Sequence, residues 1–503
     1  MSVDSVDPRT GAVRRRVSED DSEQDVRRVC AAAKAAYEEV RTRPRRWRAE
    51  LLRSMADALE ADCEPIVAAA DAETALGGAR LSGELTRTCY QLRLFAETVE
   101  DGGFLEATID HAGPTDMGPR PDLRRMLVPL GPVAVFGASN FPLAFSVPGG
   151  DTASALAAGC PVVVKVHESH PETAELCGRA LVRGAERSGA PHTIVQLVFG
   201  RAAGAALVQD PDITAVGFTG SLDGGSALMA LANARPTPIP FYGELSSLNP
   251  LVVTAAAARE RGEKLAADLV GSFTLGAGQF CTKPGLVFVP TGPDGDTLVD
   301  AAAREIRSRH GAVMLNAGIA AAYRRGLAEI AEEPGVSTRA AGTDAGEFAP
   351  APALLEVDAD QLGGRLGQEC FGPEAVVARY RDEDTLLTAL RRLPGSLTAG
   401  LHVAEGEEPP SRVLSTLEQL AGRILFNGYP TGVAVSWAQH HGGPWPATST
   451  LHTSVGMTAT RRFMRPIAWQ DAPQSALPVE LRDQTDDLPR RVDGVLVLAS
   501  DGR

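Results

Sequence analysis

Short apolar runs alternate with segments of helical pattern between residues 131 and 243. The runs include "PVAVFGA", "PVVVKV", "TIVQLVFG" and "ITAVGFTG", and the helical segment "PETAELCGRALVRGAERSG" lies between two of them. A continuous β-branched run is typical of a strand that is buried on both faces of a parallel sheet. Because parallel strands need crossover connections, the pattern predicts a doubly wound α/β domain over 131–243.

The rest of the chain indicates further structural units. With 503 residues the chain exceeds a single compact core, so two or three domains are expected. Residues 22–100 have apolar positions at helical spacing, and 105–131 holds two alternating runs joined by a Gly/Pro-rich turn, which predicts a hairpin. A second α/β alternation runs from residue 244 to about residue 430.

Charge and cysteine content narrow the function and the compartment. Lys and Arg number 49 against 64 Asp and Glu, and the net charge of −15 disfavours nucleic acid and anionic membranes as partners. The N-terminus has no apolar signal segment, and no window reaches the roughly 18 apolar residues that span a bilayer. Seven scattered cysteines without C-x-x-C spacing favour reduced thiols. We therefore expect a cytoplasmic protein.

One cysteine stands out from the other six. Cys281 lies in "GAGQFCTKPG", among glycines that let the backbone approach a ligand closely. Most cysteines are small core residues, but the polar neighbours Gln279, Thr282 and Lys283 are poor core material. We interpret Cys281 as a nucleophile, whose site lowers the thiol pKa or holds a base nearby.

Two further side chains follow apolar runs and could serve this thiol. Glu244 closes the run in "FYGELSSLNP", where burial would raise its pKa and suit it to general-base catalysis. Asn140 follows a predicted parallel strand in "GASNFP", where its amide could donate to an oxyanion. Taken singly, a helix or turn cap remains the alternative for Glu244, and a turn former for Asn140.

A dinucleotide site is indicated weakly. The sequence contains neither G-x-G-x-x-G nor a P-loop, but "FTGSLDGG" places Gly220, Ser221 and Gly225 between a strand and a helix. Small residues there can present backbone amides to a pyrophosphate. Lys165 and Glu168 end another strand, within reach of a ribose, although a solvated strand end explains them equally well.

The histidine pairs do not predict a metal centre. His167 and His170 are close in sequence, as are His440 and His441, but neither pair has an evident third ligand. We predict no metal site and interpret His440 and His441 as loop residues.

Taken together, these motifs resemble the aldehyde dehydrogenase family over nearly the whole chain. The family's motifs occur in order as "GASNFP", "KVHE", "GSLDGG", "GELSSLNP", "GQFCTKPG" and "QECFGPE". Segments such as "FPLAFSVPGGDTASALAAGCPVVVK" and "QHHGGPWPAT" are similar to the branch of 2-oxoglutarate semialdehyde dehydrogenases and bacterial long-chain aldehyde dehydrogenases.

The resemblance implies a role for each matching residue. Cys281 matches the nucleophile that forms a thiohemiacetal and then a thioester. Asn140 and the backbone N–H of Cys281 match the oxyanion hole, and Glu244 matches the base that activates water for deacylation.

The resemblance also implies the cofactor contacts. Lys165 and Glu369 match residues that hold the two riboses, Ser221 matches a residue near the pyrophosphate, and Phe371 belongs to the same motif as Glu369. Glu168 matches the acidic residue at the adenosine 2′-hydroxyl. Since a carboxylate there repels a 2′-phosphate, NAD is expected, with NADP as the alternative.

The fold that the resemblance implies has two doubly wound α/β domains and a β-hairpin oligomerisation element. The expected NAD(P)-binding domain covers 1–104 and 128–243, and the catalytic domain covers 244–450. The oligomerisation element covers 105–127 and 460–470, followed by a C-terminal tail over 471–503. A homodimer or homotetramer is expected.

The expected substrate is 2-oxoglutarate semialdehyde (2,5-dioxopentanoate), oxidised to 2-oxoglutarate. Its carboxylate needs a cationic anchor, and Arg87 falls on a helix that lines the family's substrate entrance. A long-chain aldehyde enzyme would instead need an apolar tunnel, which Phe141, Phe145 and Trp437 could supply.

Two readings from other classes stay open at this point. A cysteine hydrolase or thioesterase could use Cys281 and Glu244 without a cofactor, but the sequence shows no histidine partner for the thiol. A catalytically silent binding protein would leave the joint presence of Cys281, Glu244 and Asn140 unexplained.

Overall fold

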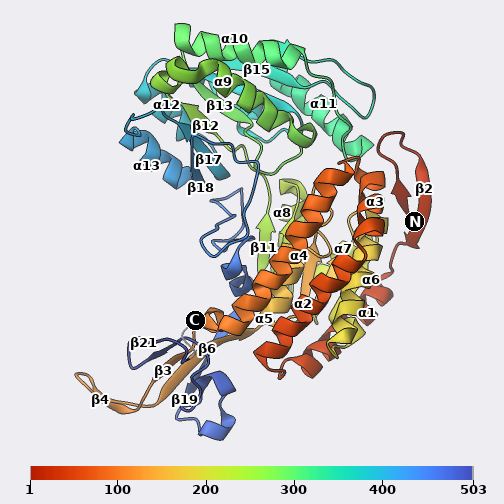
Figure 1. Ribbon diagram of the computed structural model, residues 1–503, viewed down its shortest axis with the longest axis vertical. Coiled ribbons are helices and arrows are strands. Elements are labelled where there is room, and N and C mark those ends of the chain that lie inside the picture. Colours follow the sequence, from red (N-terminus) through yellow and green to blue (C-terminus); the bar gives the residue numbers. More distant parts are fainter. Residues whose placement is uncertain (1, 501–503) are drawn as a thin grey trace.

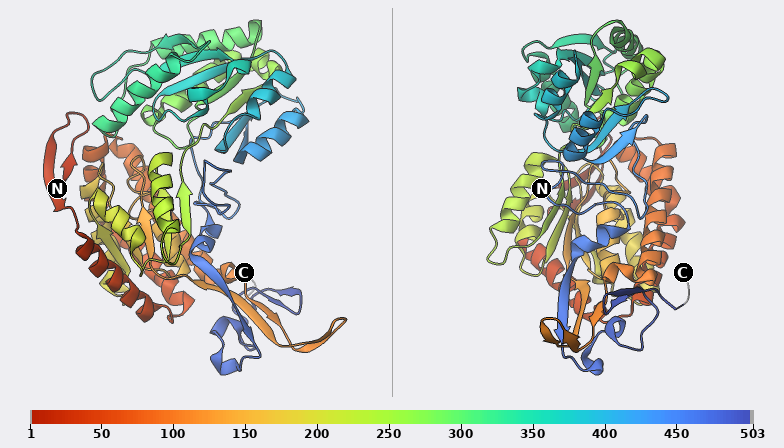
Figure 2. Two further views of the ribbon diagram at one scale, coloured as in Figure 1. Left: turned by 180° about the vertical axis from the view of Figure 1, so that it is seen from behind. Right: turned by 90° about the vertical axis from the view of Figure 1, so that its left-hand side faces the viewer.

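The computed structural model describes residues 2–500, which form two sheet-centred bodies and a projecting arm (Figure 1). We call their sheets the first sheet, the second sheet and the arm sheet. Figure 2 shows the arm extending away from the body that carries the first sheet. Within residues 2–500, no helix is both long and apolar enough to span a bilayer. All seven cysteines are free.

The first sheet confirms the predicted doubly wound alternation. Its five parallel strands have the order β11-β10-β7-β8-β9, so the chain starts in the middle and builds outward in both directions. The strands are β7 (Val133–Phe136), β8 (Val162–Lys165), β9 (Val195–Val198), β10 (Ala215–Thr219) and β11 (Phe241–Glu244). The connecting helices are α5 (Gly150–Ala158), α6 (Pro171–Arg187), α7 (Arg201–Gln209) and α8 (Leu222–Asn233). The order reverses between β7 and β10, where such folds bind ligands.

The predicted helical region over 22–100 forms four helices that pack beside the first sheet (Figure 1). They are α1 (Glu23–Val40), α2 (Arg45–Ala61), α3 (Cys63–Thr74) and α4 (Gly78–Asp101). Ser22 starts α1 with a capping box, since its hydroxyl accepts from the N–H of Asp25. The preceding hairpin of β1 (Ser2–Val6) and β2 (Val13–Glu19) was not predicted.

The second sheet has seven strands in the order β14-β15-β16-β13-β12-β17-β18. Only the edge strand β14 is antiparallel to its neighbour. The strands are β12 (Leu251–Val253), β13 (Leu286–Pro290), β14 (Ser337–Ala341), β15 (Ala353–Asp358), β16 (Glu374–Tyr380), β17 (Ser396–His402) and β18 (Ala421–Phe426). Its helices are α9 (Ala255–Thr274), α10 (Pro293–Arg307), α11 (Ala317–Ala331), α12 (Glu383–Leu390) and α13 (Ser411–Leu420).

The arm sheet joins segments that are far apart in the chain, in the order β19-β6-β3-β20-β21. The strands are β3 (Thr108–Asp110), β6 (Leu123–Pro129), β19 (Met464–Gln470), β20 (Arg490–Val492) and β21 (Val495–Val497). A small hairpin of β4 (Gly113–Thr115) and β5 (Gly118–Arg120) forms the tip. The last part of the chain therefore packs on the arm, with β20 parallel to β3.

The polar residues around Cys281 are buried, contrary to the reasoning that they are poor core material. Gln279, Thr282 and Lys283 are 0%, 2% and 3% exposed. Hydrogen bonds make this possible, because Gln279 accepts from the N–H of Leu315 and Lys283 donates to Glu374 Oε1 at 2.5 Å. The Lys283–Glu374 pair connects the Cys281 loop to the start of β16.

Removing one partner of this buried ion pair should be costly. We expect Lys283→Met to lower the free energy of unfolding by about 3–5 kcal/mol, because Glu374 is left charged without its partner. Urea unfolding measures the change. Lys264→Met removes an exposed ion pair with Asp268 and should cost less than about 1 kcal/mol. Equal losses in the two variants would contradict the prediction.

Candidate active site

Four of the predicted site residues lie at the carboxyl edge of the first sheet. Asn140 follows β7, Lys165 ends β8, Ser221 follows β10 and Glu244 ends β11. Because all five strands are parallel, these ends meet at one edge, as the sequence predicted.

A left-handed turn brings Cys281 to this edge from the second sheet. Gly276, Ala277 and Gly278 have φ of 56°, 57° and 68°, directly after α9. This conformation costs a non-glycine residue about 1–2 kcal/mol. A Cβ on Gly278 would lie 2.2 Å from the backbone of Gly372, so the turn packs directly against that loop.

Asn249 fixes the backbone on the other side of the nucleophile. Its amide nitrogen donates to the carbonyls of Cys281 and Lys283, at 2.8 and 2.9 Å. Its Oδ1 accepts from Thr398, and its own φ is 53°. The sequence analysis missed this positioning residue, although an Asn before Pro is a signal for an unusual backbone conformation.

The side chain of Asn140 lies beside the nucleophile turn. It is 6% exposed, and one of its two amide N–H groups donates to the carbonyl of Gln279 at 2.9 Å. The other N–H is available, and the backbone N–H of Cys281 has no acceptor within residues 2–500. With this geometry, the Asn140 amide and the Cys281 N–H can both donate hydrogen bonds to one substrate oxygen.

His441 corrects the interpretation of "QHHGGPWPAT" as a plain loop. The side chain is 1% exposed, and its Nε2 lies 3.0 Å from Glu244 Oε1 and 3.8 Å from Cys281 Sγ. The three functional atoms all lie within 4.8 Å of one another. The objection that the thiol lacks a histidine partner was therefore wrong. No periodic pattern marks His441, because it lies in a Gly/Pro-rich loop 160 residues beyond the cysteine.

The predicted pKa direction of Glu244 is wrong, and of the two alternatives predicted for the thiol the structure supports the nearby base. Burial raises the pKa of Glu244, but the charge of His441 and hydrogen bonds from His441, Cys281 and Ser454 outweigh it and hold the pKa below its usual value. Burial and the negative charge of Glu244 raise the pKa of the Cys281 thiol well above its usual value. The site therefore supplies a nearby proton acceptor and does not stabilise a free thiolate.

The turn between β10 and α8 has the features of a phosphate site. Ser221 caps α8, with its hydroxyl accepting from Gly224, and Gly220 precedes it. A Cβ on Gly225 would lie 2.1 Å from Leu245, so glycine is needed for α8 to approach β11. Lys165 and Glu168 form an ion pair beside this edge. These residues fit a bound dinucleotide, with the first N–H groups of α8 facing a phosphate.

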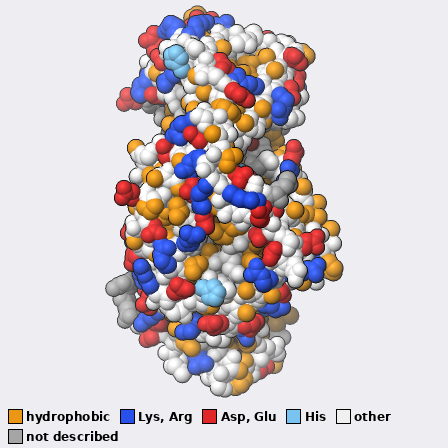
Figure 3. All heavy atoms as spheres, turned by 90° about the vertical axis from the view of Figure 1, so that its right-hand side faces the viewer, with side chains coloured by type: hydrophobic (Ala, Val, Ile, Leu, Met, Phe, Trp, Pro, Cys, Tyr) orange, Lys and Arg blue, Asp and Glu red, His pale blue; other side chains and the backbone are white. Residues whose placement is uncertain are grey.

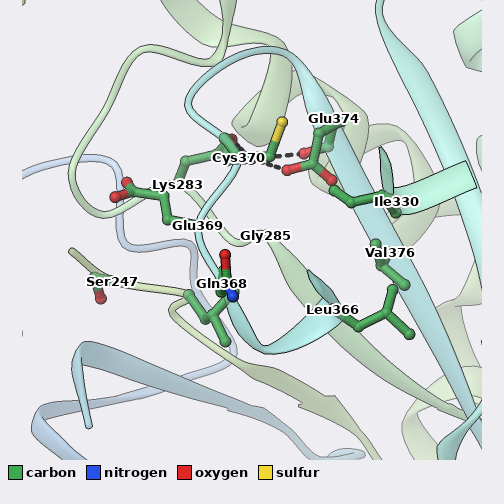
Figure 4. A pocket seen from close by; sticks show the side chains of 11 residues that line it. Ser247, Lys283, Gly285, Ile330, Leu366, Gln368, Glu369, Cys370, Glu374 and Val376 are labelled. Carbon is green, nitrogen blue, oxygen red and sulfur yellow. Dashed lines mark hydrogen bonds and ion pairs between the residues drawn. The ribbon is translucent and has the colours of Figure 1, made fainter. Parts of the chain in front are cut away.

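Glu369 lies next to the buried ion pair but points away from it (Figure 4). Burial raises the pKa of its carboxyl to about 7, against the lowering effects of Lys283 and of hydrogen bonds from Ser246 and Ser247. Phe371 follows two positions later and is partly buried. A carboxyl of this kind could accept hydrogen bonds from ribose hydroxyls.

Aromatic and cationic side chains lie around the approach to the thiol. The ring of Phe141 lies 5.3 Å from the rings of Phe145 and Phe280. Arg87 lies over Phe145, at 5.3 Å from the ring centre. Trp437 is 52% exposed in the loop that leads to His441. The predicted substrate contacts of Arg87, Phe141 and Trp437 stay predictions.

Comparisons with known proteins identify the family. The family model described as "Aldehyde dehydrogenase family" matches residues 1–445. The chain is 49% identical to "Alpha-ketoglutaric semialdehyde dehydrogenase 2" of Azospirillum brasilense, over 94% of this chain and 92% of that protein. It is 45% identical to "Alpha-ketoglutaric semialdehyde dehydrogenase" of Acinetobacter baylyi, over 93% and 91%.

Solved structures show the same fold. An NADP-dependent enzyme of E. coli has a TM-score of 0.79 at 21% identity, covering 93% of this chain and 94% of that one. An aldehyde dehydrogenase from Brucella melitensis biovar abortus has a TM-score of 0.78 at 22% identity, covering 94% of both chains. The family match over residues 1–445 and the relatives at 45–49% identity lead to one conclusion: the chain belongs to the aldehyde dehydrogenase family, whose members use NAD(P).

Proposed function

We propose that this protein oxidises 2-oxoglutarate semialdehyde to 2-oxoglutarate, with NAD as the hydride acceptor. The observation that carries the proposal is 49% identity, over 94% of the chain, to a protein named for that substrate. The buried group of Cys281, His441 and Glu244 supplies the chemistry.

Attack begins with a protonated thiol, because the raised pKa of Cys281 keeps the proton on sulfur at neutral pH. The ionised carboxylate of Glu244, which accepts a hydrogen bond from the thiol, is placed to take this proton as sulfur bonds to the aldehyde carbon, while His441 Nε2–H donates to the same carboxylate. The resulting oxyanion lies within reach of the Asn140 amide and the N–H of Cys281.

A bound NAD would supply the acceptor for the hydride of the thiohemiacetal, and loss of that hydride would leave a thioester on Cys281. The N-terminus of α8, with Gly220, Ser221 and Gly225, would hold its pyrophosphate. Lys165 and Glu168 would hold the adenosine ribose, while Glu369 and Phe371 would contact the nicotinamide ribose. The carboxylate of Glu168 favours NAD over NADP, because it repels a 2′-phosphate.

Hydrolysis of the thioester needs a base for water. Glu244 stays ionised at neutral pH because its pKa is lowered, so it can accept the proton of an attacking water. Ser454 donates to Glu244 Oε2 at 3.0 Å and His441 lies at Oε1, and these contacts orient the carboxylate. The acid product leaves with the thiol restored.

We also propose that the arm assembles the protein into a homodimer or homotetramer. Met117 at its tip is 97% exposed, and Val495, Leu496 and Leu498 at its edge are 58–67% exposed. Apolar exposure of this kind is typical of an interface.

Acidic and basic side chains are interspersed on the face shown in Figure 3. The seven free thiols support a cytoplasmic location.

Initial rates test the substrate and the cofactor together. With NAD and NADP each offered 2,5-dioxopentanoate, succinate semialdehyde and decanal, we expect the highest kcat/KM for 2,5-dioxopentanoate with NAD. Absorbance of the reduced nicotinamide measures the rate. A higher kcat/KM for decanal would contradict the proposed substrate and favour an enzyme with an apolar substrate tunnel.

A second prediction concerns proton transfer at the thiol. We expect His441→Gln to slow acylation about 10²–10⁴-fold, because His441 no longer holds Glu244, the proton acceptor of the thiol, ionised and in place. The rate of NADH formation in a single turnover measures acylation, and alkylation of Cys281 by iodoacetamide should slow as well. His440→Gln changes the adjacent histidine and serves as the matched control. Alkylation at the wild-type rate in His441→Gln would contradict the role.

A third prediction follows from the pKa of Glu369. With a pKa of about 7, the carboxyl is roughly nine-tenths protonated at pH 6 and nine-tenths ionised at pH 8. Ionisation strengthens its acceptor capacity, so KM for NAD should fall as the pH rises through 7. Glu369→Gln should remove this dependence. Identical pH profiles of KM in both proteins would exclude Glu369 as the cause.

A further inference from the structure

Two partly buried arginines hold the same short loop from the two bodies of the molecule. Arg87 on α4 donates through Nε and Nη2 to the carbonyl of Val433, at 3.4 and 3.2 Å. Arg423 on β18 donates to the carbonyls of Gly432 and Pro430, at 2.8 and 3.0 Å. Figure 1 shows that α4 belongs to the body of the first sheet and β18 to that of the second.

Neither guanidinium has a compensating carboxylate. Within residues 2–500, no Asp or Glu oxygen lies within 4.0 Å of Arg87 or Arg423. Glu84 is one turn before Arg87, but its Oε1 accepts the N–H groups of Leu143 and Ala144. The Nε of Arg423 is buried and donates to nothing in the described structure. A partly desolvated guanidinium without an ion-pair partner is costly, which indicates that an anion binds between these two side chains.

Both arginines lie close to the reacting thiol. The guanidinium of Arg87 lies over the ring of Phe145, which is 6.2 Å from the ring of His441. On the other side, a Cβ on Gly422 would lie 2.1 Å from the carbonyl of Gly442. Arg423 therefore follows a residue that packs directly against the loop of His441. Burial lowers the pKa of both guanidinium groups.

We propose that Arg87 and Arg423 form a carboxylate-binding subsite, which takes the charged end of the substrate while its aldehyde carbon lies at Cys281. The subsite rests on the proposed function and adds Arg423 as a specificity-determining residue. A guanidinium has five N–H donors, and the loop carbonyls occupy only two of those on Arg423. The rest can bind a carboxylate or the oxygens of a 2-oxo acid.

The competing explanation is that the two arginines only hold the loop over 430–433. Kinetics with a charged and an uncharged aldehyde of the same carbon number separate these roles. For Arg87→Gln and Arg423→Gln, we expect the ratio of kcat/KM for 2,5-dioxopentanoate to kcat/KM for pentanal to fall about ten- to a hundredfold. The loss should appear mainly in KM for the charged substrate, and Arg423→Lys should recover part of it. A purely structural role would lower both kcat/KM values together and leave the ratio unchanged.

Arg48→Gln is the matched control. Arg48 is also partly buried with a buried, unpartnered Nε, and it donates to the carbonyls of Ala157 and Ala158. It lies on α2, and no contact with the loop over 430–433 is present in residues 2–500. Its loss should leave the substrate ratio at the wild-type value. An equal fall of the ratio in Arg48→Gln would overturn the assignment.

A second measurement separates failure of the subsite from failure of the proposed function. If the wild-type enzyme prefers 2,5-dioxopentanoate and both Gln variants keep that preference, the subsite is wrong and the function stands. If the wild type shows no such preference, protection of Cys281 from iodoacetamide by 2-oxoglutarate decides. Protection that is lost in both variants supports the subsite. Absent or unaltered protection overturns it.

Discussion

The site depends on a thiol whose burial opposes its ionisation. Because the pKa of Cys281 is raised, the nucleophile cannot be supplied as a free thiolate at neutral pH, and a proton acceptor must lie beside it. His441 and Glu244 provide that acceptor from a late loop and from the end of β11. Much of the surrounding structure holds Cys281, His441 and Glu244 close to one another, with their functional atoms within 4.8 Å.

The contacts that hold the site come from separate parts of the chain. Asn249 fixes the carbonyl of Cys281, and the Lys283–Glu374 pair fixes the following loop to β16. Ser454, beyond the second sheet, orients Glu244 at the edge of the first. The reaction therefore needs the two sheets held in a fixed position relative to one another. This explains why the residues of the site are scattered over most of the sequence.

The fold could be predicted from the sequence because it has local signals: β-branched runs identified the first sheet. Strand ends also marked Asn140 and Glu244 as candidates, and the structure places both at the sheet edge that Cys281 approaches. His441 was missed since a Gly/Pro-rich loop has no period from which burial can be judged. The pKa of Glu244 was predicted in the wrong direction for the same reason: the sequence shows a buried carboxyl but not the histidine beside it. The buried polar residues near Cys281 were misjudged because their hydrogen-bond partners are distant in the chain.

The glycines beside the nucleophile have a consequence for how this protein can change over evolutionary time. Gly278 touches the backbone of Gly372, and a Cβ on Gly372 would lie 2.2 Å from the ring of Tyr323. The two loops and the helix α11 thus form one stack without room for added atoms. Substitutions within it should be strongly epistatic, since a change that one loop tolerates alters the space left for the next. The segments that carry Cys281 and Glu369 are therefore constrained to vary together.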